Sequence, residues 1–422
     1  MSTLPTDSRA PYRVGQWLPS DEAFLTQWLQ GMIRRTQLDA RPLHPVIAEF
    51  RDLIESDATL FMLFHQMFEQ VPRRAPYDRD PTGKPQVRDY RHMLALLNTV
   101  MTHAPEFDCT GLVGCPINTI FDWSMGTAAG MAAFLNERVN AQLKKVLNVW
   151  ARYLSSEDSA SVLNDHPHKG WFGADARRAM PSFEREFVCD PGLPHWGFRS
   201  WDDFFTRPLR PGVRPVAHPE NDAVIVNACE SAPYRIARHV NYRDTFWIKS
   251  QPYSIVHMLA NDALAAAFGG GTVYQAYLSP LSYHRWHAPV SGTVIKAWVQ
   301  DGTYFAEAAS HGFDPAGPND SQSYITEVAT RALVFIEADN PRIGLMCVLA
   351  VGMAEVSSCQ ITAYEGQHLA KGDPIGMFHY GGSTHCLIFR PEVHLEFDHH
   401  GQKPGLGAGN IPVNARIATL VG

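Results

Sequence analysis

The chain has 422 residues and a net charge of −7, from 36 basic and 43 acidic residues. Hydrophobic residues make up 45% and charged residues 19%, which excludes extensive disorder and favours a packed core in two or three domains. No run of lysine and arginine is present, so the chain lacks the basic patch of a phosphate-backbone binder, and we expect no nucleic-acid partner.

The N-terminus and the cysteines predict a cytoplasmic protein. Residues 1–17 have no apolar core, so we expect no secretory signal. The longest small or apolar run of the first half, 125–135, is shorter than the ~20 residues of a membrane span, so we expect no integral membrane association. The seven cysteines are odd in number and irregularly spaced, which is typical of reduced thiols.

The first 155 or so residues predict helices, because apolar residues recur at helical spacing. Ser20 is expected to cap the first helix, and Asp57 restarts the pattern after the second. The predicted helices cover residues 20–33, 46–54, 57–68, 91–104 and 125–154. Two turn-rich stretches, 166–173 and 189–198, mark the transition to a different pattern.

After about residue 215, alternating β-branched residues and glycine-containing turns predict many short strands. Residues 291–305 predict a hairpin with Asp301 and Gly302 in its turn. The stretch "FHYGGSTHCLIFR", residues 378–390, predicts a strand, a two-glycine turn and a second strand. The predicted fold class is α+β, with an all-helical domain over 1–180 and a β-rich domain with barrel-sandwich-like halves over 181–422.

The stretch "LSYHRWHAPVSG" places His284 and His287 three residues apart between two prolines. We interpret it as a loop in which both imidazoles point into one cleft, and the alternative is a pair of buried structural histidines. Zinc would need two further ligands at suitable spacing, and neither 166–168 nor 399–400 supplies a recognised pattern. We therefore predict no metal site.

Two further stretches carry polar residues beside apolar ones. Glu230 follows an apolar strand in "VNACES", and alone it is interpreted as an exposed turn carboxylate. The stretch "WDDFFTRPLRPGVRP", residues 201–215, is interpreted as an aromatic-anchored structural connector.

The two glycines before Ser383 have two interpretations. A tight hairpin explains them, and so does self-cleavage, because Gly382 has no Cβ to shield its carbonyl carbon from the Ser383 hydroxyl. Attack would convert the amide into an ester, and elimination followed by hydrolysis would leave a ketone at residue 383. His379 and His385 flank this site and are interpreted as solvent-facing strand residues.

The order of several motifs resembles that of the phosphatidylserine decarboxylase family. The motifs are "WDDFFTRPLRPGVRP", "IKSQPYSIVHMLA", "YLSPLSYHRWHAPVSGTV", "VGMAEVSS" and "KGDPIGMFHYGGST", which together cover roughly residues 185–400. The helical first part resembles the N-terminal extension of one branch, which contains aromatic amino-acid decarboxylases such as fungal L-tryptophan decarboxylase.

The resemblance implies a role for each matching residue. Ser383 matches the serine that becomes a pyruvoyl group, with cleavage after Gly382, so that the fragment 383–422 stays bound as a partner of the larger piece. His287 matches the base of self-cleavage, and His284 matches the residue that protonates the decarboxylated substrate. Glu230 stands where the phospholipid enzymes have an aspartate, and its longer side chain weakens the match to a Glu230-His287-Ser383 relay.

The function implied is pyruvoyl-dependent decarboxylation without pyridoxal phosphate. The substrate expected is a small aromatic L-amino acid, L-tryptophan giving tryptamine, because no apolar or basic attachment segment for a phospholipid bilayer is found. The alternatives are a phosphatidylserine decarboxylase, a biotin- or lipoyl-like carrier, a metal-dependent enzyme, and a member that cuts itself without decarboxylating. The carrier would need a lysine at a hairpin tip, which neither Lys296 nor Lys371 provides.

Overall fold

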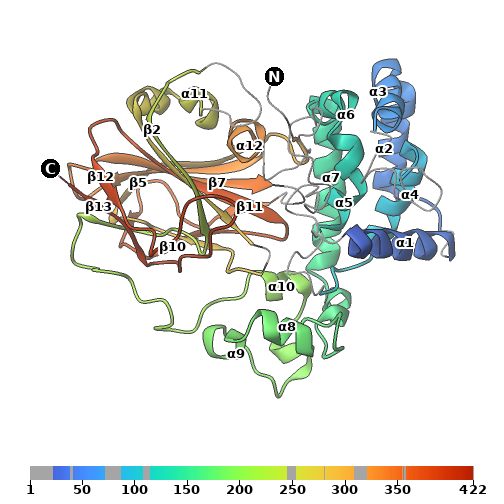
Figure 1. Ribbon diagram of the computed structural model, residues 1–422, viewed down its shortest axis with the longest axis horizontal. Coiled ribbons are helices and arrows are strands. Elements are labelled where there is room, and N and C mark those ends of the chain that lie inside the picture. The colour runs from blue at the N-terminus through green and yellow to red at the C-terminus, as the bar shows by residue number, and fades with distance from the viewer. Residues whose placement is uncertain are drawn as a thin grey trace, which may run out of the picture.

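The computed structural model describes residues 22–38, 41–71, 87–107, 115–244, 253–279, 281–307, 321–353, 355 and 358–421. The helices of the first part gather on one side of the molecule and the strands on the other, where α11 and α12 also lie, which confirms the α+β fold class (Figure 1). The helices of the first part are α1 (Glu22–Leu38), α2 (Pro45–Ser56), α3 (Ala58–Glu69), α4 (Tyr90–Val100), α5 (Pro116–Met125), α6 (Ala128–Phe134) and α7 (Glu137–Leu154). The predicted cap Ser20 lies outside the described residues.

Side-chain caps determine where these helices begin. Asp57 accepts hydrogen bonds from the amides of Thr59 and Leu60, as expected of a residue that restarts the helical pattern. The single helix predicted over 125–154 is wrong, because the chain turns twice within it. Thr127 caps α6 and Asn136 caps α7 through side-chain oxygens, so the segment forms two helices.

One hydrophobic core joins the helical part to the strand-rich part. The ring of Phe121 meets that of Phe305 edge to face at 4.9 Å, and Trp150 meets Tyr380 at 5.4 Å. Aromatic pairs of this kind add to the free energy gained from burial. The interface therefore brings α7 against Tyr380, in the segment that leads into Gly382, and α5 against Phe305. The domain boundary predicted at residue 180 stays a prediction.

Residues 157–206 form short helices that carry a dense aromatic cluster. They are η1 (Glu157–Val162), α8 (Ala174–Ala179), α9 (Phe183–Glu186), η2 (Pro194–Gly197) and α10 (Trp201–Phe205). Trp201, Phe204 and Phe205 are buried, which confirms the aromatic-anchored connector. Arg207 lies inside the cluster, with its guanidinium 4.4 Å from the ring centroid of Phe187.

The described strands form three antiparallel sheets, none of which closes into a barrel. Seven strands form the large sheet in the order β2-β3-β11-β7-β6-β5-β9, and the small sheets have the orders β1-β13-β12 and β4-β10-β8. The large sheet comprises β2 (Ala232–Val240), β3 (Gly271–Leu278), β5 (Gly292–Gln300), β6 (Arg331–Ala338), β7 (Leu345–Met353), β9 (His368–Leu369) and β11 (Gly382–Phe389). The small sheets comprise β1 (Val224–Val226), β4 (Arg285–His287), β8 (Cys359–Ile361), β10 (Pro374–Phe378), β12 (Leu395–Phe397) and β13 (Arg416–Leu420).

The large sheet is the middle layer of three. One face packs against the small sheets in a core that contains Leu387, Trp286 and Phe378. The other face contributes Cys386 and Val351 to a second core, which is covered by α11 (Ile255–Met258), η3 (Ala263–Phe268) and α12 (Gln322–Val328) (Figure 1). Burial on both faces explains the long apolar run of β7 and the apolar second half of β11, residues 386–389.

Two predicted hairpins are wrong. β5 ends at Gln300 and pairs with β6 and β9, so Asp301 and Gly302 do not turn the chain back onto β5. β10 and β11 are consecutive strands but belong to different sheets, since β10 pairs with β4 and β8 while β11 pairs with β3 and β7. The two-glycine segment therefore carries the chain from one layer to the next.

Substitution of Arg207 by Met is expected to lower the free energy of unfolding by about 3 kcal/mol, because it orphans buried carbonyl oxygens that the guanidinium satisfies. Those acceptors are the backbone oxygens of Phe204, Leu281 and Ser282, at 3.1, 2.8 and 3.2 Å. Urea denaturation measures the change. The control Arg199→Met, at an exposed side chain, should change the free energy by less than about 0.5 kcal/mol. Equal midpoints for the two variants would contradict this role of Arg207.

Candidate active site

Ser383 is the second residue of β11, in the middle of the large sheet. It pairs with Leu278 of β3 on one side and Gly352 of β7 on the other. Its side chain is fully buried, and its Oγ has no hydrogen-bond partner among the described residues. Gly381, at a φ of +137°, makes the turn that leads into the strand. A buried hydroxyl without a partner is costly in a structural role and is available for chemistry.

His284 lies just before β4 in a dry, aromatic environment. Its ring is fully buried and stacks on Phe205 at 4.1 Å between ring centroids, and Phe205 also contacts Tyr380. Neither ring nitrogen has a hydrogen-bond partner within the described part of the chain. Burial lowers the pKa of His284 to about 3, so the imidazole is neutral at physiological pH.

His287 ends the three-residue strand β4, so the loop predicted for this motif is wrong at His287, while His284 lies outside the strand. Its Nδ1 donates to the carbonyl oxygen of Gly372 at 2.7 Å, which leaves Nε2 to accept from the Tyr283 hydroxyl at 2.9 Å. Burial lowers the pKa of His287, which keeps the ring neutral. The two histidines have different partners, since His284 contacts Phe205 and His287 contacts Tyr283.

Glu230 is half-buried and forms a two-point ion pair, so it is not the exposed turn carboxylate expected from "VNACES" alone. Its oxygens accept from Arg214 at 3.0 and 2.7 Å, and Oε2 also accepts from the Val413 amide at 3.0 Å. Glu230 makes no hydrogen bond to His287 among the described residues, since both ring nitrogens of His287 have other partners. The Glu230-His287-Ser383 relay stays a prediction. Arg214 was missed, although it lies at the end of the motif 201–215.

Glu355 and Cys115 lie close to Gly382 and were also missed. Glu355 follows β7 within the motif "VGMAEVSS", and an acidic residue between apolar ones was the available signal. Cys115 precedes α5, and its thiol interacts with the Glu355 carboxyl, the Tyr380 hydroxyl and the backbone of Gly382. The sequence offers no sign that these residues meet, because 240 positions separate them in the numbering.

The two histidines beside Ser383 differ from expectation. His385 is fully buried on β11, so its interpretation as a solvent-facing residue is wrong. Burial lowers the pKa of His385 to about 3. His379 is partly buried, with Nδ1 2.8 Å from Asp202 and Nε2 3.0 Å from Gln360. Burial of β11 on both faces is the physical reason for the error at His385.

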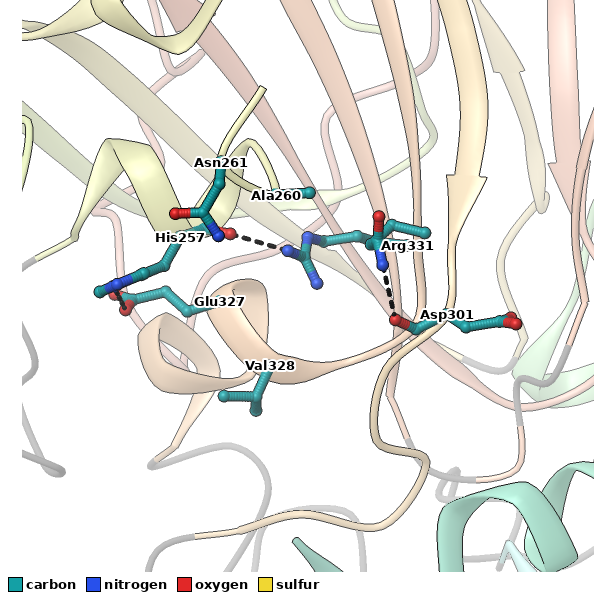
Figure 2. A pocket seen from close by; sticks show the side chains of 8 residues that line it. His257, Ala260, Asn261, Asp301, Glu327, Val328 and Arg331 are labelled. Atoms are coloured by element: carbon teal, nitrogen blue, oxygen red, sulfur yellow. Dashed lines mark hydrogen bonds and ion pairs between the residues drawn. The ribbon is translucent and has the colours of Figure 1, made fainter. Parts of the chain in front are cut away.

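A surface pocket of about 380 Å³ lies between α11, α12 and the start of β6. Figure 2 shows Glu327 and His257 facing each other and Arg331 directed toward His257, whose backbone oxygen accepts from its guanidinium. Arg331 is buried and satisfied by backbone carbonyl oxygens. The pocket contains none of the four predicted site residues.

The lysines considered for a carrier are engaged elsewhere. Lys371 is buried, and its ammonium donates to the backbone oxygens of His218, Asn221 and Val224. Lys296 pairs with Asp262. Across the described ranges, no group of three or more His, Cys, Asp or Glu side chains could hold a metal ion. None of the described helices combines the length and the apolar character needed to cross a bilayer.

Comparisons with known proteins identify the family to which the chain is similar. Two family models described as phosphatidylserine decarboxylase match residues 44–180 and 201–408. L-tryptophan decarboxylase of Psilocybe cubensis is 37% identical over 429 residues, covering 96% of this chain and 94% of its own. Decarboxylase iboD of Amanita muscaria is 43% identical over 302 residues, covering 67% and 86%. A phosphatidylserine decarboxylase proenzyme of Chlamydia pneumoniae is 30% identical over 224 residues, covering 53% and 70%.

These matches define the class of protein as a decarboxylase, an enzyme of the carboxy-lyase type. The chain belongs to the phosphatidylserine decarboxylase family, in the branch of the fungal L-tryptophan decarboxylases. Members of this family are in general pyruvoyl-dependent.

The buried neutral histidines predict that stability falls as the pH drops below about 6.5. The unfolded chain takes up protons on His284 and His385 below that pH, while the folded chain keeps both neutral down to about pH 3. At pH 5 the free energy of unfolding is lower by about 2 kcal/mol for each of these two histidines. Denaturant midpoints of His385→Gln should fall less between pH 7 and pH 5 than those of the wild type. The exposed control His394→Gln should match the wild type, and an equal fall in all three proteins would contradict the account.

Proposed function

We propose that the chain cuts itself between Gly382 and Ser383 and then decarboxylates an aromatic L-amino acid, with L-tryptophan to tryptamine as the expected reaction. The observation that carries the proposal is the buried, unpartnered Oγ of Ser383, directly after two glycines. The names of the relatives support both reactions. Some are proenzymes, which supports the cut, and some are L-tryptophan decarboxylases, which supports the decarboxylation.

The cut begins when the Ser383 Oγ attacks the carbonyl carbon of Gly382 and its proton passes to a base. The C–N bond breaks, the former amide nitrogen of Ser383 becomes an amine, and an ester links the two residues. Removal of the Ser383 Cα proton then expels the Gly382 carboxylate and leaves a double bond between Cα and Cβ. Tautomerisation and hydrolysis release ammonia and leave a ketone at residue 383.

The fold explains how the small fragment 383–422 would remain after the cut. β11 is hydrogen-bonded along one edge to β3 and along the other to β7. β12 and β13 of the same fragment form a sheet with β1 of the larger piece. All eight residues of β11 are buried, so release would expose a central strand of the core.

His287 is proposed as the base of the cut and His284 as the residue that returns a proton to the substrate carbon. Nε2 of His287 carries the lone pair a base requires, and it now accepts from Tyr283. Taking the proton of Ser383 requires His287 to leave that hydrogen bond. His284 is neutral, so its N–H nitrogen can give a proton to the substrate carbon only as its other nitrogen takes one up, and neither nitrogen is held by a hydrogen bond among the described residues.

A pyruvoyl group at residue 383 would supply a carbonyl that binds an amine and accepts the electrons left when CO₂ departs. The site fits such a group, because residue 383 is shielded from water by both core layers and its Oγ holds no structural bond. Cys229, next to Glu230, packs in the same core as Trp286 of β4. The ion pair of Glu230 with Arg214 would therefore hold the segment around residue 230 next to β4.

The aromatic substrate rests on the relatives, and a phospholipid is the second candidate. A cavity of about 10 Å³ lies beside β7 at Gly352 and Met353, which pair with Ser383 and Gly382. It has room for about one water and not for an indole ring, so the aromatic preference is supported by the relatives alone. Purified enzyme incubated with L-tryptophan, L-phenylalanine, L-tyrosine and phosphatidylserine vesicles should release CO₂ and amine from an amino acid. Release only from vesicles would reverse the assignment.

Replacement of Ser383 by Ala should leave one uncut chain without decarboxylase activity, because no hydroxyl remains to attack Gly382. Denaturing gels and CO₂ release measure the two effects. The neighbouring control Thr384→Ser keeps a hydroxyl at both positions and should be cut. Cutting of the Ser383→Ala chain at the same bond would contradict the proposal.

Replacement of the two histidines should separate the two reactions. His287→Ala should slow the cut by about 10² to 10⁴, the usual contribution of a positioned base, and should leave mainly full-length chain. His284→Ala should still be cut, while its decarboxylation rate falls by a similar factor. Gels measure the cut, and single-turnover CO₂ release on the same samples measures decarboxylation. If His284→Ala blocked the cut and His287→Ala only slowed decarboxylation, the two histidines would have each other's role.

A further inference from the structure

Glu355 is a buried carboxyl held in an unusual backbone conformation. It lies two residues after Met353, which pairs with Gly382, and its exposed fraction is 2%. Its φ is +29°, in the left-handed region that non-glycine residues seldom adopt. Strained, buried acids of this kind concentrate at functional sites, where the surrounding structure maintains them.

The carboxyl of Glu355 is held by the first turn of α5, a helix of the N-terminal part. Oε1 accepts from the amide of Asn118 at 3.1 Å and from the amide of Ile117. These amides are among the donors that a helix leaves without intrahelical partners. Oε2 makes no hydrogen bond of standard geometry within the part of the chain that the structure describes. The first turn of α5 therefore holds Oε1 of the Glu355 carboxyl and leaves Oε2 without a backbone donor.

Cys115 connects this carboxyl to the predicted cut. The residue is buried directly before α5, and its thiol interacts with the Glu355 carboxyl on one side. On the other side the thiol interacts with the backbone of Gly382 and with the Tyr380 hydroxyl. Glu355 is held by α5 two residues after Met353, the β7 partner of Gly382, and the Cys115 thiol lies near both.

We propose that Glu355 and Cys115 are a positioning pair, assembled between the helical part and the large sheet, that holds the Gly382 backbone for attack by Ser383. The proposal rests on the self-cleavage proposed above. It also gives the helical region a role at the cut, because α5 supplies the amides that hold Glu355 and the chain just before it supplies Cys115.

The pair works with Glu355 protonated. Burial raises the pKa of Glu355 to about 8, and burial likewise raises the pKa of the Cys115 thiol. The titratable groups near the carboxyl are Cys115 and, beyond it, Tyr380, while the described part of α5 adds only two backbone amides. Cutting creates a carboxylate at Gly382. A neutral Glu355 tolerates that charge, whereas an ionised one would repel it.

The test follows the cut in full-length chains pulse-labelled by cell-free synthesis and then chased at pH 6.5 to 9.5. The rate at which wild-type chains are cut should fall about tenfold above pH 8, as Glu355 ionises. Glu355→Gln, which stays neutral, should cut within about threefold of the wild type at pH 7 and should lack that fall. Glu355→Ala should cut at least about tenfold more slowly at every pH. Cys115→Ser, which keeps a hydrogen-bonding group, should cut faster than Cys115→Ala.

Glu327→Gln is the matched control, since Glu327 is also buried and accepts from a backbone amide, that of Ser254, but lies in the α12 pocket. It should cut as the wild type does. If wild-type chains do not split at all, the proposed function itself fails. If wild-type chains split, either of two results would overturn the positioning pair while self-cleavage stands. In the first, the cutting rate of Glu355→Gln falls above pH 8 as the wild-type rate does. In the second, both alanine variants cut at the wild-type rate. Should Glu355→Ala misfold, the pH profile of Glu355→Gln alone decides.

Discussion

Burial of β11 on both faces is the constraint on which the rest of the site depends. The strand lies between β3 and β7 and between two hydrophobic cores, so each of its residues is held by neighbours on four sides. Ser383 is therefore fixed in place without any hydrogen bond of its own side chain. A strand held this firmly can lose the peptide bond before it and still remain in the sheet, which the proposed reaction requires.

The helical part covers the end of β11 at which Gly382 and Ser383 lie. Trp150 and Trp201 pack against Tyr380, and the first turn of α5 donates two amide hydrogen bonds to Glu355. The site is therefore enclosed by two regions that are distant in sequence. This explains why the imidazole of His284 is dry and neutral, because aromatic side chains around α10 and Tyr380 cover it.

The parts of the fold that the sequence predicted are those governed by local patterns. Helical spacing and the cap at Asp57 predicted most helices, and the change of pattern after residue 215 predicted the sheets. Most of the wrong predictions concern which segments contact each other; the exception is the helix predicted over 125–154, which local caps at Thr127 and Asn136 divide. A glycine turn between two strands, as at 381–382, looks the same whether the strands pair with each other or pass between layers. Burial of His385, and the meetings of Glu230 with Arg214 and of Glu355 with Cys115, arise from contacts between distant segments, which one sequence does not reveal.

The central claim is that residue 383 does not remain a serine in the active enzyme. The most direct measurement is the intact mass of purified, active protein, combined with treatment by a carbonyl reagent such as phenylhydrazine. The account predicts two chains, one ending at Gly382 and one covering 383–422 with a ketone at its start, and loss of activity with the reagent. A single full-length chain with an intact Ser383 in fully active enzyme would contradict it.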